Sequence, residues 1–179
     1  MGNREALREL QTRLAQRLHA DGADPSAATW LAFECMGQGV VVPLPAAGEI
    51  FPLCPLLPVP HTKTWFLGVA NLRGQLHGVV DLAAFLGLRP PLGLEQLREP
   101  QRSPARLLAF NANLGSHCAV LIDRLAGLRS ANQLHKARTQ DPSSPAFAPA
   151  QWHDDEGRSW QELDLGTLAR HEQYLAIAA

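Results

Sequence analysis

The sequence is poor in cysteine, and the thiols that it has are not clustered. It contains three cysteines among 179 residues, Cys35, Cys54 and Cys118, and none belongs to a C-x-x-C pair. An odd number of widely spaced cysteines argues against a disulfide framework and against a zinc site. We therefore expect three small thiols, buried or half-buried, in a reducing compartment.

Long apolar runs and catalytic signatures are also missing. No stretch approaches the ~20 apolar residues that span a membrane. Residues 1–24 are charged throughout and lack the apolar run of a signal peptide. The sequence has no Walker loop, no G-x-G-x-x-G and no G-x-S-x-G. We expect a cytoplasmic protein that is not an enzyme, needs no cofactor and does not insert into the membrane.

The seven histidines are scattered, and none pairs with a Cys, Asp or Glu at a spacing typical of metal ligands. The run His153-Asp154-Asp155-Glu156 is acidic enough to hold a cation, but it precedes Gly157 in a predicted turn. We interpret it as a solvated charge cluster, and we expect no metal site.

Excess positive charge is absent as well. The chain has 16 Lys and Arg against 17 Asp and Glu, a formal net charge of −1, and only 6% aromatic residues. A small β-barrel nucleic-acid-binding protein, which is the alternative from a different class, would need a basic stripe with exposed aromatic side chains. The composition therefore favours a protein partner over nucleic acid.

What the sequence does contain begins with an amphipathic pattern at residues 4–20. Four leucines recur there at a helical spacing, Leu7, Leu10, Leu14 and Leu18. We expect residues 1–27 to form a helix and a linker. The leucine stripe packs on its own domain, or it docks a partner or a second copy of the chain.

From residue 28 the pattern changes to short β segments separated by Gly and Pro. The predicted strands are a hairpin over Leu31–Val42, then Ile50–Leu53, Trp65–Leu72, Gln75–Val80, Arg106–Phe110, His117–Ile122, Asp123–Leu134 and Ser159–Asp164. Short helical segments are predicted at Ala46–Glu49, Leu82–Leu86, Leu94–Arg98 and Leu165–His171. This pattern indicates an all-β fold, closed or nearly closed, with minor helices.

The segment Gly68–Gly87, GVANLRGQLHGVVDLAAFLG, is the most informative part of the chain. It predicts a strand, a tight turn at Arg73-Gly74, a second strand, and a short helix that begins after Asp81. We expect its apolar residues to be buried, namely Val69, Leu72, Leu76, Val79, Val80, Leu82, Phe85 and Leu86. Arg73 is either a solvated turn residue, a partner of a nearby carboxylate, or a donor to another protein, since its planar guanidinium suits carboxylates and carbonyls.

This segment resembles the signature of the CheW-like adaptor domain, which links chemoreceptors to a histidine kinase in bacterial chemosensory arrays. The resemblance rests on G-V-A-N-L-R-G at Gly68–Gly74, V-V-D-L at Val79–Leu82 and L-G at Leu86-Gly87. A softer likeness extends over residues 28–175, which we expect to form one CheW-like domain. The resemblance implies two five-stranded, SH3-like β-barrel subdomains packed side by side around a shared apolar seam.

The resemblance also implies partners and a site. The partners are the regulatory domain of a CheA-type histidine kinase and the cytoplasmic tip of a methyl-accepting chemoreceptor, so that the chain is associated with receptor arrays through them. The implied interface residues are Asn71, Leu72, Arg73, Gly74, Val80 and Asp81. From the residue types alone, we expect Asp81 to be a helix N-cap or to form a salt bridge to Arg73. Gly74 should provide a positive φ in the turn, and Leu72 and Val80 should lie in the core.

Departures from the usual family pattern point to a branch. Gly78 stands where relatives commonly have proline, which we expect to loosen the start of this strand. This chain also has V-A-N before Leu72 and a longer N-terminal segment. These features resemble the pilus-associated, PilI-type adaptors of twitching motility, and a flagellar chemotaxis adaptor is the alternative.

Overall fold

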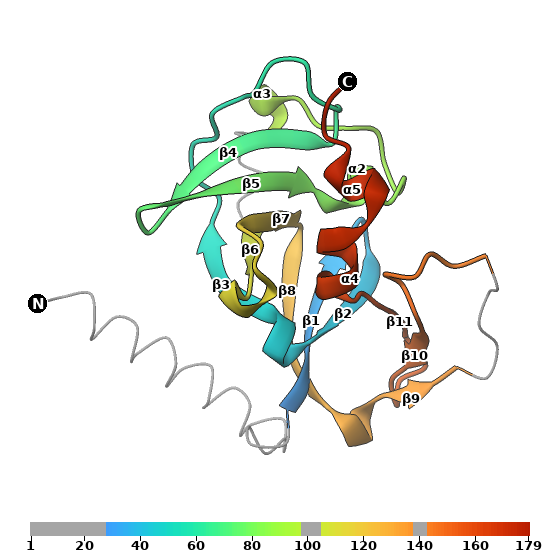
Figure 1. Cartoon of the computed structure of the whole chain (residues 1–179). Coiled ribbons are helices and arrows are strands. Elements are labelled where there is room, and N and C mark those ends of the chain that lie inside the picture. Colours follow the sequence, from blue (N-terminus) through green and yellow to red (C-terminus); the bar gives the residue numbers. More distant parts are fainter. Residues whose placement is uncertain (1–27, 98–104, 138–142) are drawn as a thin grey trace, which may run out of the picture.

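The computed structural model describes residues 28–97, 105–137 and 143–179, so the predicted helix at residues 4–20 lies outside the described part. Two β-sheets, one of six strands and one of five, lie against each other (Figure 1). The strands are β1 (Ala28–Cys35), β2 (Gln38–Pro43), β3 (Ala47–Pro52), β4 (Phe66–Leu72), β5 (Gln75–Asp81), β6 (Arg106–Phe110), β7 (Cys118–Ile122), β8 (Arg124–Ser130), β9 (His135–Lys136), β10 (Gln151–His153) and β11 (Ser159–Glu162). The predicted class, mostly β with few helices, is confirmed.

The six-stranded sheet combines the beginning and the end of the described chain, in the order β8-β1-β2-β11-β10-β9. The predicted hairpin β1–β2 is confirmed, and its turn places Met36 and Gly37 at φ of 51° and 75°. The two edge strands of the six-stranded sheet, β8 and β9, are joined by the 3-10 helix η5 (Ala131–Gln133). The short strands β9 and β10 were not predicted, and β9 makes this sheet one strand larger than expected.

The five-stranded sheet has the order β3-β6-β7-β5-β4. The predicted pairs β4–β5 and β6–β7 are both confirmed as antiparallel. β5 also pairs with β7 in parallel, so the strand that carries the V-V-D-L motif lies inside the sheet. A strand with neighbours on both sides is a rigid support for the turn at its start.

The helical turn predicted at Ala46–Glu49 was wrong. The chain forms a 3-10 helix, η2, at Leu44–Ala46 and is already extended at Ala47, where β3 begins. A Cβ atom at Gly48 would lie 2.7 Å from the carbonyl oxygens of Ala109 and Phe110. The glycine lets β3 approach β6 closely, and this pairing outweighs the local helical preference.

Successive residues on the strands point to different cores. Val79, Leu107 and Leu121 belong to a cluster within the five-stranded subdomain. Their neighbours belong to a seam shared by both sheets, which includes Leu31, Phe33, Val40, Val42, Val80, Leu108, Val120 and Ile122. A smaller cluster around Trp160 fills the six-stranded subdomain. The arrangement agrees with the predicted pair of subdomains around an apolar seam.

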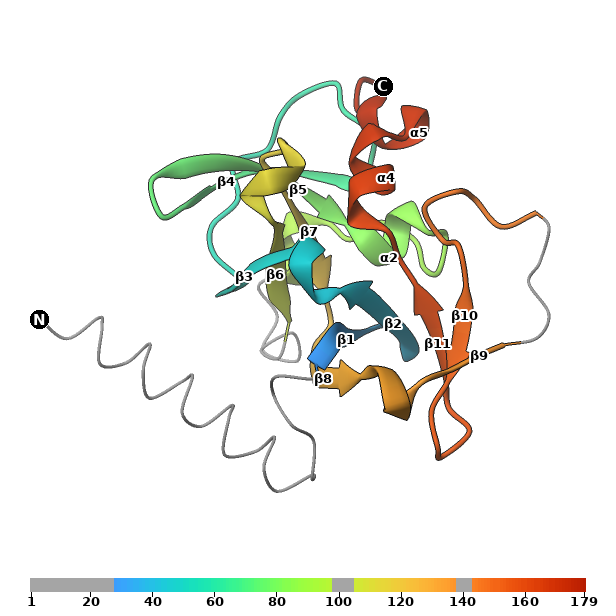
Figure 2. The ribbon, with the colours of Figure 1, turned by 60° about the horizontal axis from the view of Figure 1, so that its bottom comes forward.

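The helices are short: α2 (Leu82–Phe85), α3 (Leu94–Leu97), α4 (Leu165–Arg170) and α5 (Glu172–Leu175). Figures 1 and 2 show α4 and α5 following β11 along one side of the molecule, toward the five-stranded sheet. In the part of the chain that the structure describes, no helix has the length and hydropathy needed to cross a membrane.

The three cysteines are free thiols, with Cys35 buried and Cys54 and Cys118 half-buried. This outcome matches the prediction from their spacing. Burial raises the pKa of the Cys35 thiol to about 12, so this thiol is neutral and is not a nucleophile at neutral pH.

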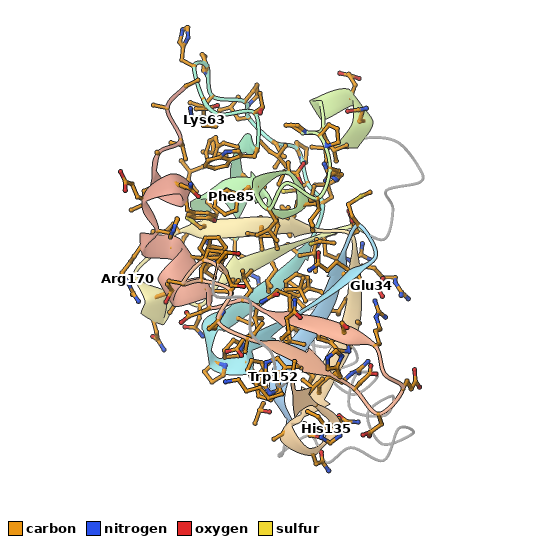
Figure 3. All side chains as sticks on the ribbon, turned by 90° about the vertical axis from the view of Figure 1, so that its right-hand side faces the viewer. Glu34, Lys63, Phe85, His135, Trp152 and Arg170 are labelled. Atoms are coloured by element: carbon orange, nitrogen blue, oxygen red, sulfur yellow. The ribbon has the colours of Figure 1, made fainter. Side chains whose placement is uncertain are left out.

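A buried carboxylate links three parts of the six-stranded subdomain. Glu34 on β1 accepts hydrogen bonds from Arg124 Nε at 2.8 Å and Nη2 at 2.6 Å, and a further one from Arg158 Nη2. Arg158 also lies over the Trp160 ring, 4.5 Å from its centroid. Figure 3 shows Glu34 on the face of the molecule away from Arg170. The hydrogen bonds from Arg124 and Arg158 lower the pKa of Glu34, although burial acts in the opposite direction.

Replacing Glu34 should therefore destabilise the protein in a pH-dependent way. The folded-state pKa lies below the ordinary value of 4.5, so the carboxylate stabilises the fold above that pH and loses its effect as the pH falls through the lower pKa. We expect Glu34→Gln to lower the free energy of unfolding by about 1–2 kcal/mol at neutral pH, because both arginines are partly exposed. Below about pH 4 the difference should shrink.

Urea denaturation at a series of pH values measures this difference, with Glu156→Gln, an exposed carboxylate in a turn, as the control. A destabilisation by Glu34→Gln that stays constant from neutral to acidic pH would assign the effect to packing instead of charge.

Candidate protein-interaction site

The Gly68–Gly87 motif folds into a hairpin with a two-residue turn. Arg73 and Gly74 have φ of 52° and 85°, positive at both central positions. Two positive φ values are the signature of a type I′ turn, whose twist matches that of the flanking strands. Asn71 Oδ1 accepts a hydrogen bond from Gly74 N at 2.7 Å. The turn is therefore fixed from within the motif, and Asn71 and Gly74 have structural roles in it.

Arg73 projects from this turn and is the exposed cation of the motif. Its side chain is 61% exposed, and Nη2 lies 2.6 Å from Glu49 Oε1 on β3. Since β3 and β4 are the two edge strands of the five-stranded sheet, the ion pair spans the open side of that sheet. An exposed pair of this kind adds about 0–1 kcal/mol, and it leaves other guanidinium donors able to bind another molecule.

Other predicted site residues lie inside the protein. Leu72 is 4% exposed and packs in the core of the five-stranded subdomain, and Val80 is 2% exposed and packs in the seam. Neither side chain is available for direct contact with a partner. The predicted set thus separates into an exposed part at the turn, made of Asn71, Arg73 and Gly74, and a buried part that supports it.

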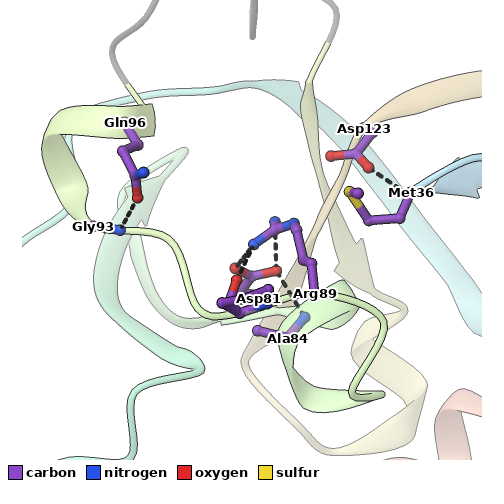
Figure 4. A network of polar contacts seen from close by, with 8 residues as sticks. Met36, Asp81, Ala84, Arg89, Gly93, Gln96 and Asp123 are labelled. Carbon is purple, nitrogen blue, oxygen red and sulfur yellow. Dashed lines mark hydrogen bonds and ion pairs between the residues drawn. The ribbon is translucent and has the colours of Figure 1, made fainter.

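Asp81, fully buried at the end of β5, holds several segments together (Figure 4). Its Oδ1 accepts a hydrogen bond from Ala84 N at 3.2 Å, which confirms the predicted N-cap of α2. Arg89 donates to both carboxylate oxygens, at 2.6 and 2.8 Å, and its side chain is only 6% exposed. The alternative partner, Arg73, is paired with Glu49 instead.

Gly78, the residue at which the chain departs from the family pattern, has two contacts in the sheet. Its N–H donates to the carbonyl oxygen of His117 at 2.9 Å, a bond that proline could not make. A Cβ atom at this position would lie 3.2 Å from the Phe66 ring. The predicted loosening of the strand stays a prediction, but the glycine has a packing role.

The acidic run after His153 forms a turn, as the sequence indicated. Asp154 accepts hydrogen bonds from the backbone N–H groups of Glu156 and Arg158 and from Trp160 Nε1. Burial raises the pKa of Asp154, but these hydrogen bonds outweigh it and the net pKa is lowered. Across residues 28–97, 105–137 and 143–179, no group of three or more His, Cys, Asp or Glu side chains is placed to hold a metal ion.

Two ionic partners of the motif were missed from the sequence, and the burial of one motif residue was predicted wrongly. Glu49 and Arg89 were missed because their contacts depend on the fold and not on a local pattern. Leu76, the second residue of β5, is 68% exposed, so the prediction that it is buried was wrong. Leu76 and His77 point to opposite faces of the strand, and the buried side chain is His77, the reverse of what their polarity indicates.

The Asp81–Arg89 pair yields a clear stability prediction. Asp81→Asn keeps the size of the side chain but leaves a buried guanidinium without its counter-ion, so we expect the free energy of unfolding to fall by about 3–5 kcal/mol. Arg89→Met should be destabilising in the same way. The double variant should lose less than the sum of the two single losses, because neither charge then remains unpaired.

Chemical denaturation of the four proteins in this double-mutant cycle measures the coupling between the two residues. Arg73→Ala, which breaks an exposed pair, is the control and should change stability by no more than about 1 kcal/mol. Additive losses at Asp81 and Arg89 would contradict the structural role of the pair.

Comparison with known proteins agrees with this geometry. Protein PilI of Pseudomonas aeruginosa is 26% identical over 169 residues, which cover 93% of this chain and 89% of that protein. A probable chemotaxis protein CheW of Rhizobium etli is 38% identical over 60 residues, or 34% of this chain and 39% of that protein. The crystal structure of the scaffolding protein TtCheW from Thermoanaerobacter tengcongensis superposes with a TM-score of 0.63 at 16% identity, covering 80% of this chain and 88% of that one.

The structural match shows that the fold is that of CheW, with its two packed sheets. The family model described as the CheW-like domain matches residues 29–173, which include the hairpin, the seam and α4. The chain therefore belongs to the CheW-like domain family, whose members are non-catalytic scaffolding adaptors.

Proposed function

We propose that this protein couples methyl-accepting chemoreceptors to a CheA-type histidine kinase, and that the turn at Arg73 is part of the surface that makes this coupling. The observation that carries the proposal is the exposed guanidinium of Arg73 on a type I′ turn, within a motif of the CheW-like family. We place the protein in the cytoplasm, associated with receptor arrays through its partners. It binds these partners and catalyses no reaction.

The chemistry of the turn fits a protein partner. Arg73 presents a planar fork of donors, suited to a carboxylate or a helix carbonyl. Leu76, 68% exposed and close in sequence, adds apolar surface beside that charge. Arginine is enriched among the residues that contribute most of the binding energy of protein interfaces. A turn that is already fixed loses little conformational entropy on binding, which favours affinity.

The two-subdomain architecture supports a bridging role. One subdomain can contact the kinase regulatory domain while the surface near Arg73 contacts a receptor tip, because the two sheets are held together by a single apolar seam. A small shift of the receptor would then change the conformational equilibrium of the kinase through a shared assembly. The adaptor supplies contacts and positioning to this process.

Within the family, the pilus-associated branch is the better supported assignment. The similarity to PilI extends over nearly the whole chain, whereas the similarity to the Rhizobium CheW protein covers about a third of it. We therefore propose a role in controlling type IV pilus twitching motility. A flagellar chemotaxis adaptor is the second candidate, since the match to the Rhizobium CheW protein, although shorter, has a higher sequence identity than the match to PilI.

Charge reversal at Arg73 tests the site. We expect Arg73→Glu to weaken binding of the cognate receptor tip by about 1–3 kcal/mol, because a donor fork becomes a repelling carboxylate. Isothermal titration calorimetry with the receptor tip measures the loss, and circular dichroism checks that the fold is intact.

Arg124 offers a matched control, since it is also 61% exposed and paired with a glutamate but lies in the other subdomain. Arg124→Ala should leave receptor affinity unchanged, while Arg73→Ala should reduce it. Equal affinities for Arg73→Glu and wild type would remove Arg73 from the interface. Tighter binding to receptors of a flagellar system than to those of a pilus system would reject the pilus assignment.

A further inference from the structure

The C-terminal segment crosses from one subdomain to the other. β11 belongs to the six-stranded sheet, and Leu163 N still donates to Val41 O on β2 at 2.9 Å. α4 and α5 then lead toward β4 and β5 (Figure 1). Residues 177–179 end beside residues 61–63, where Lys63 N donates to Ile177 O at 2.7 Å and Ala179 N donates to His61 O at 3.0 Å. Two segments from different subdomains are thus joined by backbone hydrogen bonds.

Tyr174 is the anchor of this crossing. It is the only tyrosine of the sequence and is 3% exposed. The centroid of its ring lies 5.4 Å from the ring centroid of Phe85, 6.1 Å from that of Phe110 and 6.3 Å from that of Trp65. These three residues come from α2, β6 and the segment before β4, so an aromatic ring of the C-terminal segment fills a pocket built by the five-stranded subdomain. Figure 3 shows Phe85 and Lys63 at the same end of the molecule.

Two buried polar groups of this segment lack a hydrogen-bond partner among the described residues. His171 Nδ1 is buried and has no hydrogen-bond partner among the described residues. The hydroxyl oxygen of Tyr174 is likewise buried without a hydrogen-bond partner among the described residues, and its burial raises the pKa of Tyr174 well above the usual value. A buried polar group without a good partner lowers the stability of the docked state.

The segment also has little stability of its own. α4 and α5 have six and four residues, too few for an isolated helix to persist in water. Leu175, next to the anchor, is 62% exposed and adds little burial. The order of residues 171–179 therefore depends on the aromatic pocket, on the edge contact between the rings of His171 and Phe147, whose centroids are 4.8 Å apart, and on the two backbone hydrogen bonds to residues 61 and 63.

The pocket is connected to the hairpin that carries Arg73 through Asp81. Asp81 N donates to the carbonyl oxygen of Trp65 at 2.8 Å, and its carboxylate caps α2, which carries Phe85. Two walls of the Tyr174 pocket are thus fixed by the residue that ends β5, the strand whose other end carries the Arg73 turn.

We propose that residues 171–179 form a detachable strap across the seam, anchored by Tyr174. When it is docked, the strap ties the two subdomains together on this side of the molecule. When it is released, residues 61–65 and α2 gain freedom while both sheets stay folded, since the seam and the two subdomain cores are formed mainly by other residues. This inference concerns the chain alone and goes beyond the proposed coupling of receptor and kinase.

Hydrogen exchange measured by NMR on the full chain tests the strap. In Tyr174→Ala we expect the amides of Lys63 and Leu86 to exchange about tenfold faster or more, because their protection depends on the docked strap. The amides of β1, β2, β6 and β7 should keep their protection. Tyr174→Phe is the matched control and should exchange like wild type, since it keeps the ring and loses only a hydroxyl that has no hydrogen-bond partner among the described residues.

A second variant, which ends at Leu175, keeps the anchor but removes the pairing with residues 61–63. It should speed exchange at Lys63 and leave Leu86 protected. Unchanged exchange at Lys63 in both variants would overturn the proposal. Loss of protection throughout both sheets in Tyr174→Ala would also overturn it, since Tyr174 would then be an ordinary part of the core. Neither result depends on receptor binding, so a failure here leaves the proposed function standing.

Discussion

The buried carboxylate of Asp81 is the interaction on which the candidate site depends. It ends β5, caps α2, binds both ends of the Arg89 guanidinium, and its backbone N–H holds the segment that precedes β4. A charge with no exposure to solvent is tolerated only when it is paired and hydrogen-bonded, and here both conditions hold. β5 lies between β4 and β7, so its fixed C-terminal end gives the Arg73 turn at its other end a rigid base.

This rigidity supports the proposal that a surface with a small number of exposed side chains binds a partner. Arg73 and Leu76 protrude from the hairpin, while Leu72 and Val80 fill two different cores beneath it. The contact surface and its support are therefore made by neighbouring residues of one motif. The seam joins that support to the six-stranded subdomain, where a separate network around Glu34 fixes β1, β8 and the turn before β11. Contact residues that are held in place by such supports lose less conformational entropy when a partner binds.

Much of this arrangement could be predicted from the sequence. Alternating apolar residues gave the strands, Arg73-Gly74 gave the tight turn, and Asp81 before an apolar run gave the helix cap, since each of these signals is local. The partners Glu49 and Arg89 could not be predicted, because the folded sheet brings Glu49 to Arg73 and the path of the chain after α2 brings Arg89 back to Asp81. β9 and β10 have two and three residues, too few for an alternating pattern. The helix expected at Ala46–Glu49 was wrong because the close approach of Gly48 to β6 is a tertiary contact.

The most direct test of the central claim is an NMR titration of the isotope-labelled protein with the cognate receptor tip, following the backbone amides and the Arg73 Nε–H resonance. The account predicts that the largest shifts fall on residues 71–76 and on Arg73 Nε–H, with small changes around Glu34 and in the β10–β11 turn. Saturable shifts that leave residues 71–76 and Arg73 Nε–H unmoved would contradict it, since the receptor would then bind another face of the molecule.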